Sequence, residues 1–64
     1  MAETDPFDEL DHTMRGVRLL SKAILAAIER HDVPAIESLS RVRADLEKDV
    51  DRLLVVTDRI VRHE

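Results

Sequence analysis

The chain has 64 residues, a net charge of −4, 38% charged and 44% hydrophobic residues, one phenylalanine and no cysteine or tryptophan. A chain of this length forms one domain at most, and it buries only about 60% of the surface that it exposes when unfolded. Without cysteine, neither a disulfide nor a cysteine-ligated zinc site can supplement the core, which leaves a partner chain. Because so short a chain rarely encloses a pocket of roughly 300 Å³, we expect no enzyme, no catalytic site and no cofactor.

The charge and the apolar runs also bear on the class of partner. Nucleic-acid-binding domains cluster Lys and Arg and have a pI above about 9, whereas this chain has a pI near 5.3 and intersperses its basic residues with acids. The longest apolar runs, 23–28 and 53–56, are far shorter than the ~20 residues that span a bilayer. The acidic first residues do not resemble a secretory signal. We therefore expect a soluble, cytoplasmic protein that neither binds nucleic acid nor spans a membrane.

A first helix is predicted over about residues 6–30, after a tail at residues 1–4. Asp5 can accept a hydrogen bond from the free amides of the first turn, and Pro6 needs no donor there. Downstream, residues recur at steps of three and four, which is the spacing of one helical stripe. This stripe comprises Phe7, Leu10, Met14, Val17, Ser21, Ile24 and Ile28, and it is widened on one side by Leu20, Ala23 and Ala27. The pattern predicts a helix that faces more than one neighbour, with Phe7 largely buried.

A turn is predicted at residues 31–34, because Pro34 disfavours the helical conformation of the residue before it. Asp32 or Val33 suits a helix cap, and His31 suits a capping role beside the free carbonyls that end the first helix. A second helix follows over about 34–62 with the same spacing. Its stripe comprises Ile36, Leu39, Arg43, Leu46, Val50, Leu53, Thr57 and Ile60.

The fold predicted from these elements is all-α, an antiparallel two-helix hairpin that forms a single domain over residues 1–64. A turn this short forces the helices antiparallel, and centring the turn on residues 32 and 33 pairs residues whose numbers sum to roughly 65. This register brings Phe7 to Leu53, Val56 or Ile60. It also brings the acidic residues 5, 8 and 9 to the basic residues 59 and 62. We expect the hairpin to form a coiled coil with a partner helix or to pair into a four-helix bundle.

The sequence holds more apolar residues than one seam between two helices can hide. Clustered exposed apolar residues mark interaction sites, and covering them at about 25 cal/mol per Å² contributes several kcal/mol, comparable to the stability of a small domain. We therefore predict a partner-binding surface that comprises Leu54, Val55 and Val61, with Leu19 and Leu25 as secondary members.

Two further features carry alternatives. Glu9 and His12 have the Glu-x-x-His spacing of carboxylate-bridged metal bundles, but both lie off the apolar stripe, so we expect surface residues and no metal site. Gly16 lies inside the first helix, where glycine costs about 1 kcal/mol relative to alanine. It either allows another helix to approach closely or is merely tolerated.

The segment from Leu20 to Leu54, with the stretches 26–39 and 43–46 as its core, resembles the helix-turn-helix of small flagellar and type III export chaperones of the FliT and FlgN kind. The shared features are a helix that ends in acidic and basic residues, an Asp at the turn and an Arg-x-x-Leu step in the next helix. Val33 stands where an aromatic residue is common in that family. The resemblance implies a cytoplasmic hairpin that masks an amphipathic segment of an export substrate.

The leading functional hypothesis is a non-enzymatic protein–protein interaction module, such as a small chaperone or adaptor, that binds an amphipathic helix of a protein partner or of its own copy. A second hypothesis is a structural or regulatory homo-oligomer, in which two hairpins form a homodimeric four-helix bundle. A third is a metal-binding bundle that uses Glu9 and His12.

Overall fold

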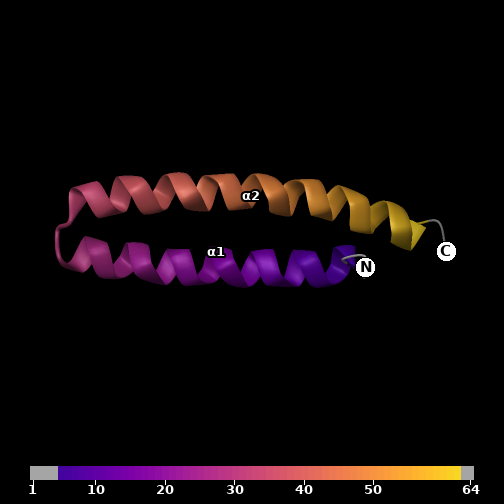
Figure 1. Cartoon of the computed structure of the whole chain (residues 1–64), viewed down its shortest axis with the longest axis horizontal. Helices are drawn as coiled ribbons and strands as arrows, with labels where there is room; N and C mark the ends of the chain where they lie inside the picture. Colours follow the sequence, from indigo (N-terminus) through magenta and orange to yellow (C-terminus); the bar gives the residue numbers. More distant parts are fainter. Residues whose placement is uncertain (1–4, 63–64) are drawn as a thin grey trace, which may run out of the picture.

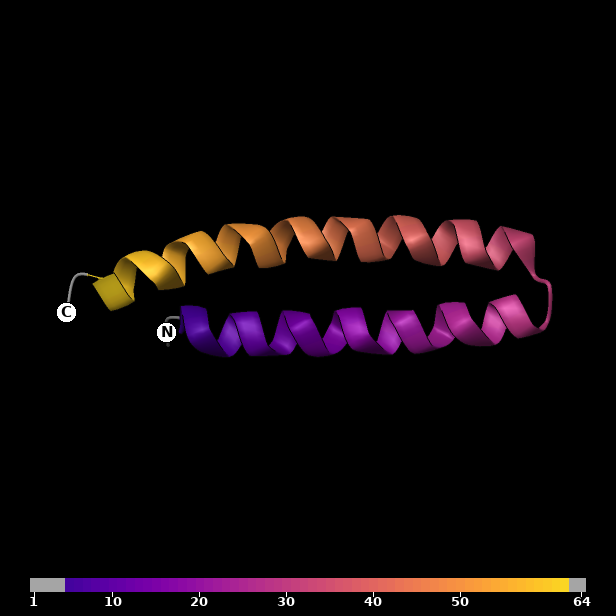
Figure 2. The same ribbon diagram turned by 180° about the vertical axis from the view of Figure 1, so that it is seen from behind.

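The computed structural model describes residues 5–62, which form two helices, α1 (Pro6–Glu29) and α2 (Val33–Arg62). The helices lie side by side and antiparallel, joined by a short turn, and the C-terminal end of α2 extends beyond the start of α1 (Figures 1 and 2). The all-α hairpin is therefore confirmed, and the predicted helix bounds agree with the observed ones to within one residue. The predicted tail at residues 1–4 lies outside the described residues.

The start of α1 follows the predicted local chemistry. Asp5 is the N-cap, and its Oδ1 accepts a hydrogen bond of 2.9 Å from the backbone N–H of Phe7. The backbone carbonyl of Asp5 accepts the first helical bond, from the N–H of Glu9 at 2.9 Å. Pro6 occupies the first helical position, where its missing N–H leaves nothing unsatisfied. Two acidic residues in the first turn, Asp8 and Glu9, interact favourably with the positive end of the helix dipole.

The end of α1 is a Schellman motif, in which two backbone N–H groups return to the last helical carbonyls. The N–H of His31 donates to the carbonyl of Ile28 at 3.0 Å, and the N–H of Asp32 donates to that of Ala27 at 2.9 Å. His31 has a φ of 54°, in the left-handed region that favours glycine. His31 thus caps α1 through its backbone, and the capping by its cationic side chain stays a prediction.

Asp32 also begins α2. Its Oδ1 accepts a hydrogen bond of 3.3 Å from the N–H of Ala35, and its carbonyl accepts one of 3.0 Å from the N–H of Ile36. Pro34 lies in the first turn of α2, where no donor is needed. One residue thus closes α1 with its N–H and opens α2 with its side chain and carbonyl. The connection between the helices shortens to three residues, Arg30–Asp32.

The stripe of α1 that faces α2 differs from the predicted one. The buried residues among those described are Ile24 and Ala27 in α1 and Leu53 and Thr57 in α2. In α1 the side chains along the seam are Leu10, Thr13, Val17, Leu20, Ile24 and Ala27, all buried or half-buried. Phe7 is 45% exposed, so the prediction that it is largely buried is wrong. Met14 and Ile28, members of the same predicted stripe, are exposed as well.

The short turn explains this rotation. It holds the ends of the helices close together, and Ala27, whose side chain is a single methyl group, faces α2 there with 0% exposure. Leu20 and Thr13 lie seven and fourteen residues before Ala27, so they face the same way in a coiled coil. Ile28 directly follows Ala27, and Met14 directly follows Thr13. Each is therefore rotated by about 100° around the helix axis from a residue that faces α2.

The seam also contains polar residues that satisfy their own hydrogen bonds. The buried hydroxyl of Thr57 donates to the carbonyl of Leu53 at 2.9 Å, and Thr13 donates in the same way to Glu9 at 2.8 Å. Half-buried Arg43 pairs with Glu47 along α2 at 3.2 Å. These bonds remove the penalty for burying a polar group.

The register between the helices is shifted from the predicted one. A Cβ atom on Gly16 would lie 3.4 Å from Cδ1 of Leu46, and Glu9 pairs with Arg52 at 3.6 Å. The predicted register would have placed residues 49 and 56 of α2 opposite these two residues of α1. The shift of three to four residues arises because the turn centres on His31 rather than on residues 32 and 33. Glu9 consequently reaches Arg52 and not the predicted basic residues 59 and 62.

Candidate interaction surface

All five residues predicted to bind a partner are exposed, but they do not share one face of the hairpin. Leu54 and Val61 lie seven residues apart in α2, and Leu54 directly follows the buried Leu53. Val55 lies two residues from both Leu53 and Thr57, which places it on the side of α2 opposite the seam. In α1, Leu19 and Leu25 lie on opposite sides of the seam, because their spacing is not one that returns to the same face of a helix. The predicted surface therefore divides into separate parts.

Two rows of residues lie beside each other along one side of the seam. In α1 the row comprises Phe7, Met14, Ser21 and Ile28; in α2 it comprises Val33, Ser40, Glu47, Leu54 and Val61. Each residue of these rows directly follows the second of the two seam residues in its heptad. In an antiparallel coiled coil, residues at this position of one helix lie beside residues at the same position of the other helix. A hollow lined by both Met14 and Glu47 shows that the two rows share one side.

These rows carry most of the exposed bulky apolar side chains. We call the following set the apolar face: Phe7, Met14, Leu25, Ile28, Val33, Leu54 and Val61. It includes seven of the eleven large hydrophobic residues that are exposed. Leu25 belongs to it because it lies four residues after Ser21 and three before Ile28, on the same stripe. Exposed apolar side chains thus gather on one side of the hairpin and draw on both helices.

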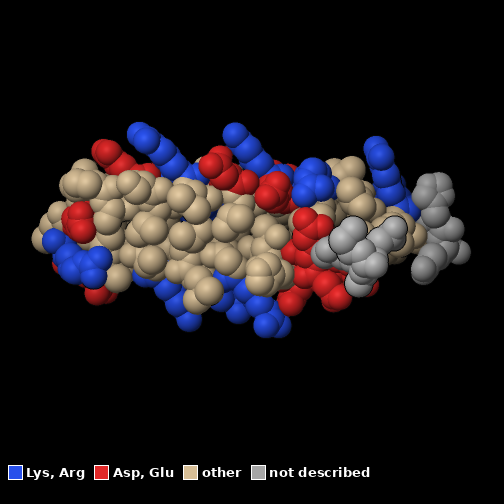
Figure 3. Space-filling model, viewed as in Figure 1, with Lys and Arg blue, Asp and Glu red and all other residues tan. Residues whose placement is uncertain are grey.

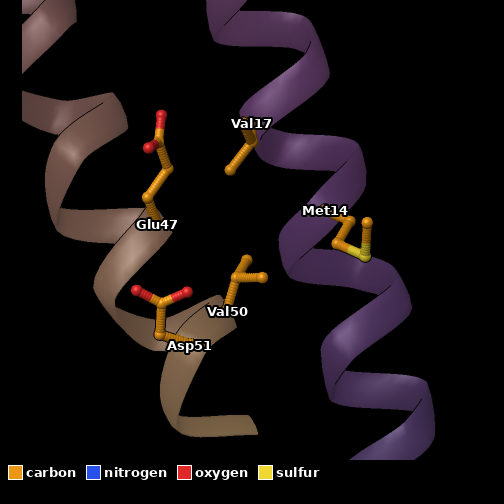
Figure 4. Close-up of a pocket in the computed structure, with 5 residues that line it drawn as sticks. All are labelled: Met14, Val17, Glu47, Val50 and Asp51. Carbon is orange, nitrogen blue, oxygen red and sulfur yellow. The ribbon is translucent and has the colours of Figure 1, made fainter. Parts of the chain in front are cut away.

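The hollow near the middle of the apolar face has a volume of about 240 Å³. Val17 of α1 and Val50 of α2 project into the space between the helices, with Met14 beside them (Figure 4). Glu47 and Asp51, one turn apart on α2, line its other side. The hollow therefore combines an apolar floor with two carboxylates along one wall, which suits an apolar side chain flanked by a cation.

Charged residues follow the edges of the hairpin. One side of the molecule shows a band of uncharged residues, and both basic and acidic residues along its two long edges (Figure 3). Between His12 and Ile28, α1 carries three cations, Arg15, Arg18 and Lys22, and no acid. Beside the apolar face, in contrast, the charged residues at the edge of α2 are Glu37, Asp51 and Asp58. The edge of α2 beside this face is therefore acidic, whereas the edge of α1 carries one residue of each sign, Asp11 and Arg18.

Arg18 and Asp51 hold equivalent places on these edges. Arg18 lies four residues after Met14, and Asp51 lies four residues after Glu47, so each flanks the apolar face from its own helix. The one acid on this edge of α1, Asp11, forms an ion pair of 3.2 Å with Arg15. At the edge of α2, Asp58 pairs with Arg62 at 3.0 Å.

The metal hypothesis gains no ligand cluster from the described residues. Glu9 is half-buried and reaches the cation Arg52, while His12 is exposed. Within residues 5–62, no three side chains of His, Asp or Glu come together in a way that could hold a metal ion. Glu9 therefore acts as an ion-pair partner across the two helices.

No protein-family model, curated protein or solved structure matches this sequence. The resemblance to export chaperones accordingly stays a prediction. Neither α1 nor α2 contains a stretch that is long and apolar enough to cross a bilayer. What the geometry defines is a class: a helical hairpin with one uncovered apolar face.

Four members of the apolar face were not among the predicted partner-binding residues: Phe7, Met14, Ile28 and Val33. The spacing of apolar residues predicts the first three on the inside of the hairpin. The sequence signal for the observed arrangement is the competing row Thr13, Leu20 and Ala27. Its last member, Ala27, has a small side chain, which allows the two helices to approach each other closely beside the short turn.

Proposed function

We propose that this chain is a non-enzymatic protein–protein interaction module that binds an amphipathic helix on its apolar face. The observation that supports the proposal is the gathering of seven large exposed hydrophobic side chains on one side of a two-helix hairpin. Exposed apolar side chains that gather on one side of a molecule in this way mark interaction sites. A groove between two helices suits a third helix, whose residues at steps of three, four and seven cover the two rows.

The hollow defines what such a helix should carry. An apolar anchor would fill the space above Val17 and Val50, and a neighbouring Lys or Arg would meet the carboxylates of Glu47 and Asp51. A chaperone or adaptor that masks an amphipathic segment of a protein partner, as the resemblance to export chaperones implies, would use the surface in this way. The homo-oligomeric bundle is the second candidate, and it would use the same surface.

The test compares two neighbouring residues of α2. Leu54 is 48% exposed and lies on the apolar face, and Val55 is 53% exposed and lies outside it. The probe is a fluorescein-labelled peptide of about 18 residues with leucines on one helical face and lysines on the other, with a scrambled sequence as its control. We expect Leu54→Asp to weaken binding at least tenfold, which is about 1.4 kcal/mol, and Val55→Asp to bind as the unsubstituted chain does.

Fluorescence anisotropy measures the binding, and circular dichroism checks that both variants keep their helix content. Equal binding by Leu54→Asp and the unsubstituted chain would refute the proposal. So would equal binding of the scrambled peptide, because the surface would then recognise charge and not an amphipathic helix.

A further inference from the structure

We infer that the occupant of the apolar face is a basic amphipathic helix of another protein, which carries Lys or Arg where it covers the hollow. The inference rests on the proposed function, because it uses the same face. It adds the charge of the partner helix and the place of its cations, and it sets aside a second copy of this chain as the occupant.

The charged residues beside the apolar face are mostly acids. Among the described residues, the exposed charged ones on this side of the hairpin are Asp11 and Arg18 of α1 and Glu37, Glu47, Asp51 and Asp58 of α2. Acids therefore outnumber cations five to one around the face. Partners that bind a protein surface tightly complement its charge, and like charges across an interface disfavour the contact. A partner that covers this face has to be basic.

Ion pairs within the chain do not bring cations onto this side. Asp11 pairs with Arg15 at 3.2 Å, and Asp58 pairs with Arg62 at 3.0 Å. Arg15 lies opposite the α1 seam, and Arg62 lies seven residues after Val55, opposite the α2 seam. Such exposed pairs contribute little to stability. The carboxylates beside the apolar face therefore remain available to a partner.

The hollow has acids on both of its sides. The register between the helices sets Asp11 of α1 at the height of Asp51 of α2. Asp51 lines the hollow, and Asp11 lies about one turn before Met14, which lines it from α1. Glu47 pairs with half-buried Arg43 at 3.2 Å, whereas Asp51 forms no ion pair within residues 5–62. A Lys or Arg above the hollow would therefore meet carboxylates from both helices.

The end of the face beside the turn has no such excess of acids. It consists of Leu25, Ile28 and Val33, and the two charges between the hollow and the turn, Arg18 and Glu37, have opposite signs. The other four acids lie in the half of the face that is distant from the turn. The partner helix should therefore be apolar along its whole contact, with its cations gathered in the half that covers the hollow.

A second copy of the chain does not offer this charge. It presents the same face, in which acids outnumber cations five to one. Contact between two such faces brings like charges together, and this opposes association. The acids that favour a basic helix thus disfavour self-association through the same surface.

The experiment measures the affinities of fluorescein-labelled peptides of about 18 residues by fluorescence anisotropy. Three peptides share one leucine face, and their polar faces carry lysine, glutamine or glutamate. A fourth carries lysine in one half of its polar face and glutamine in the other. We expect the lysine peptide to bind at least tenfold more tightly than the glutamate peptide. The half-lysine peptide should also bind more tightly than the glutamine peptide.

Three substitutions of α2 with the same change of charge locate the cations. Asp51→Lys should weaken binding of the half-lysine peptide by about threefold or more. Glu37→Lys changes the same edge two heptads away, beside the turn, and should have a smaller effect. Asp45→Lys is the matched control for net charge, because exposed Asp45 directly precedes Leu46 on the side away from the apolar face. Circular dichroism checks that each variant keeps its helices.

Three outcomes overturn the inference. Equal affinity for the lysine and glutamate peptides excludes a basic partner, and the proposed function still stands if Leu54→Asp weakens both. Equal effects of Asp51→Lys and either Glu37→Lys or Asp45→Lys show that the cations are not held at the hollow. Sedimentation equilibrium should give 7.3 kDa; a dimer that Leu54→Asp dissociates assigns the face to a second copy.

Discussion

Replacing Gly16 with alanine should stabilise the hairpin. Glycine inside a helix is about 1 kcal/mol less favourable than alanine, because it loses more backbone freedom on folding. The added Cβ would lie 3.4 Å from Cδ1 of Leu46, which is ordinary van der Waals contact with the end of a flexible side chain. We therefore expect Gly16→Ala to raise the free energy of unfolding by about 0.5–1 kcal/mol, which corresponds to several degrees in Tm for a domain of this size.

Urea unfolding followed by far-ultraviolet circular dichroism measures this change. Ala26→Gly is the reciprocal control, because Ala26 is an exposed residue of the same helix and reports the intrinsic propensity difference alone. The gain at Gly16 should be close to the loss at Ala26. Because Gly16 lies across the α1 seam from Met14, the substitution should leave binding at the apolar face unchanged.

A loss of stability in Gly16→Ala would refute the reasoning. It would mean that α2 approaches α1 too closely at Leu46 for a methyl group, and that Gly16 is required for helix packing. If the gain is much smaller than the loss in Ala26→Gly, the difference between them is the free-energy cost of displacing the side chain of Leu46.

Two further substitutions test the turn and the rotated seam. His31→Gly should raise the free energy of unfolding by about 0.5 kcal/mol, because glycine removes the left-handed strain but adds freedom to the unfolded chain; a loss in urea unfolding would show that the imidazole itself stabilises the turn. Leu53→Ala should cost about 2–5 kcal/mol, since Leu53 is only 2% exposed. In dilute protein, half-exposed Phe7→Ala should cost less than Leu53→Ala, and the reverse order would place Phe7 in the seam.

Local signals in the sequence were sufficient to predict the elements of the fold. Asp5 and Pro6 mark the start of α1, and Asp32 marks the start of α2, because each satisfies backbone groups within a few residues of itself. The spacing of apolar residues identified both helices. The stripe of α2, with Leu53 and Thr57 as its most buried members, was predicted correctly from Ile36 to Thr57, whereas its last predicted member, Ile60, is 38% exposed.

The face of α1 could not be predicted in the same way. The rows that end in Ala27 and in Ile28 both follow the three-four spacing of a helix, and the second row is the more hydrophobic. The choice between them depends on how closely the turn holds the two helices, which is a property of the hairpin and not of α1 alone. The same choice sets the candidate site, because the row that turns away from α2 becomes the apolar face.

The rotated seam has an energetic consequence. It buries Ile24, Ala27 and Leu53 as its hydrophobic core and leaves Phe7, Met14 and Ile28 exposed, so the hairpin hides few apolar side chains and leaves its one phenylalanine at the surface. Small domains with few buried residues gain little beyond the conformational entropy that folding costs. A partner that binds only the folded hairpin adds its binding free energy to the stability of the fold. If a partner covers the apolar face as proposed, its binding and the folding of the hairpin are coupled, and a substitution on that face changes both.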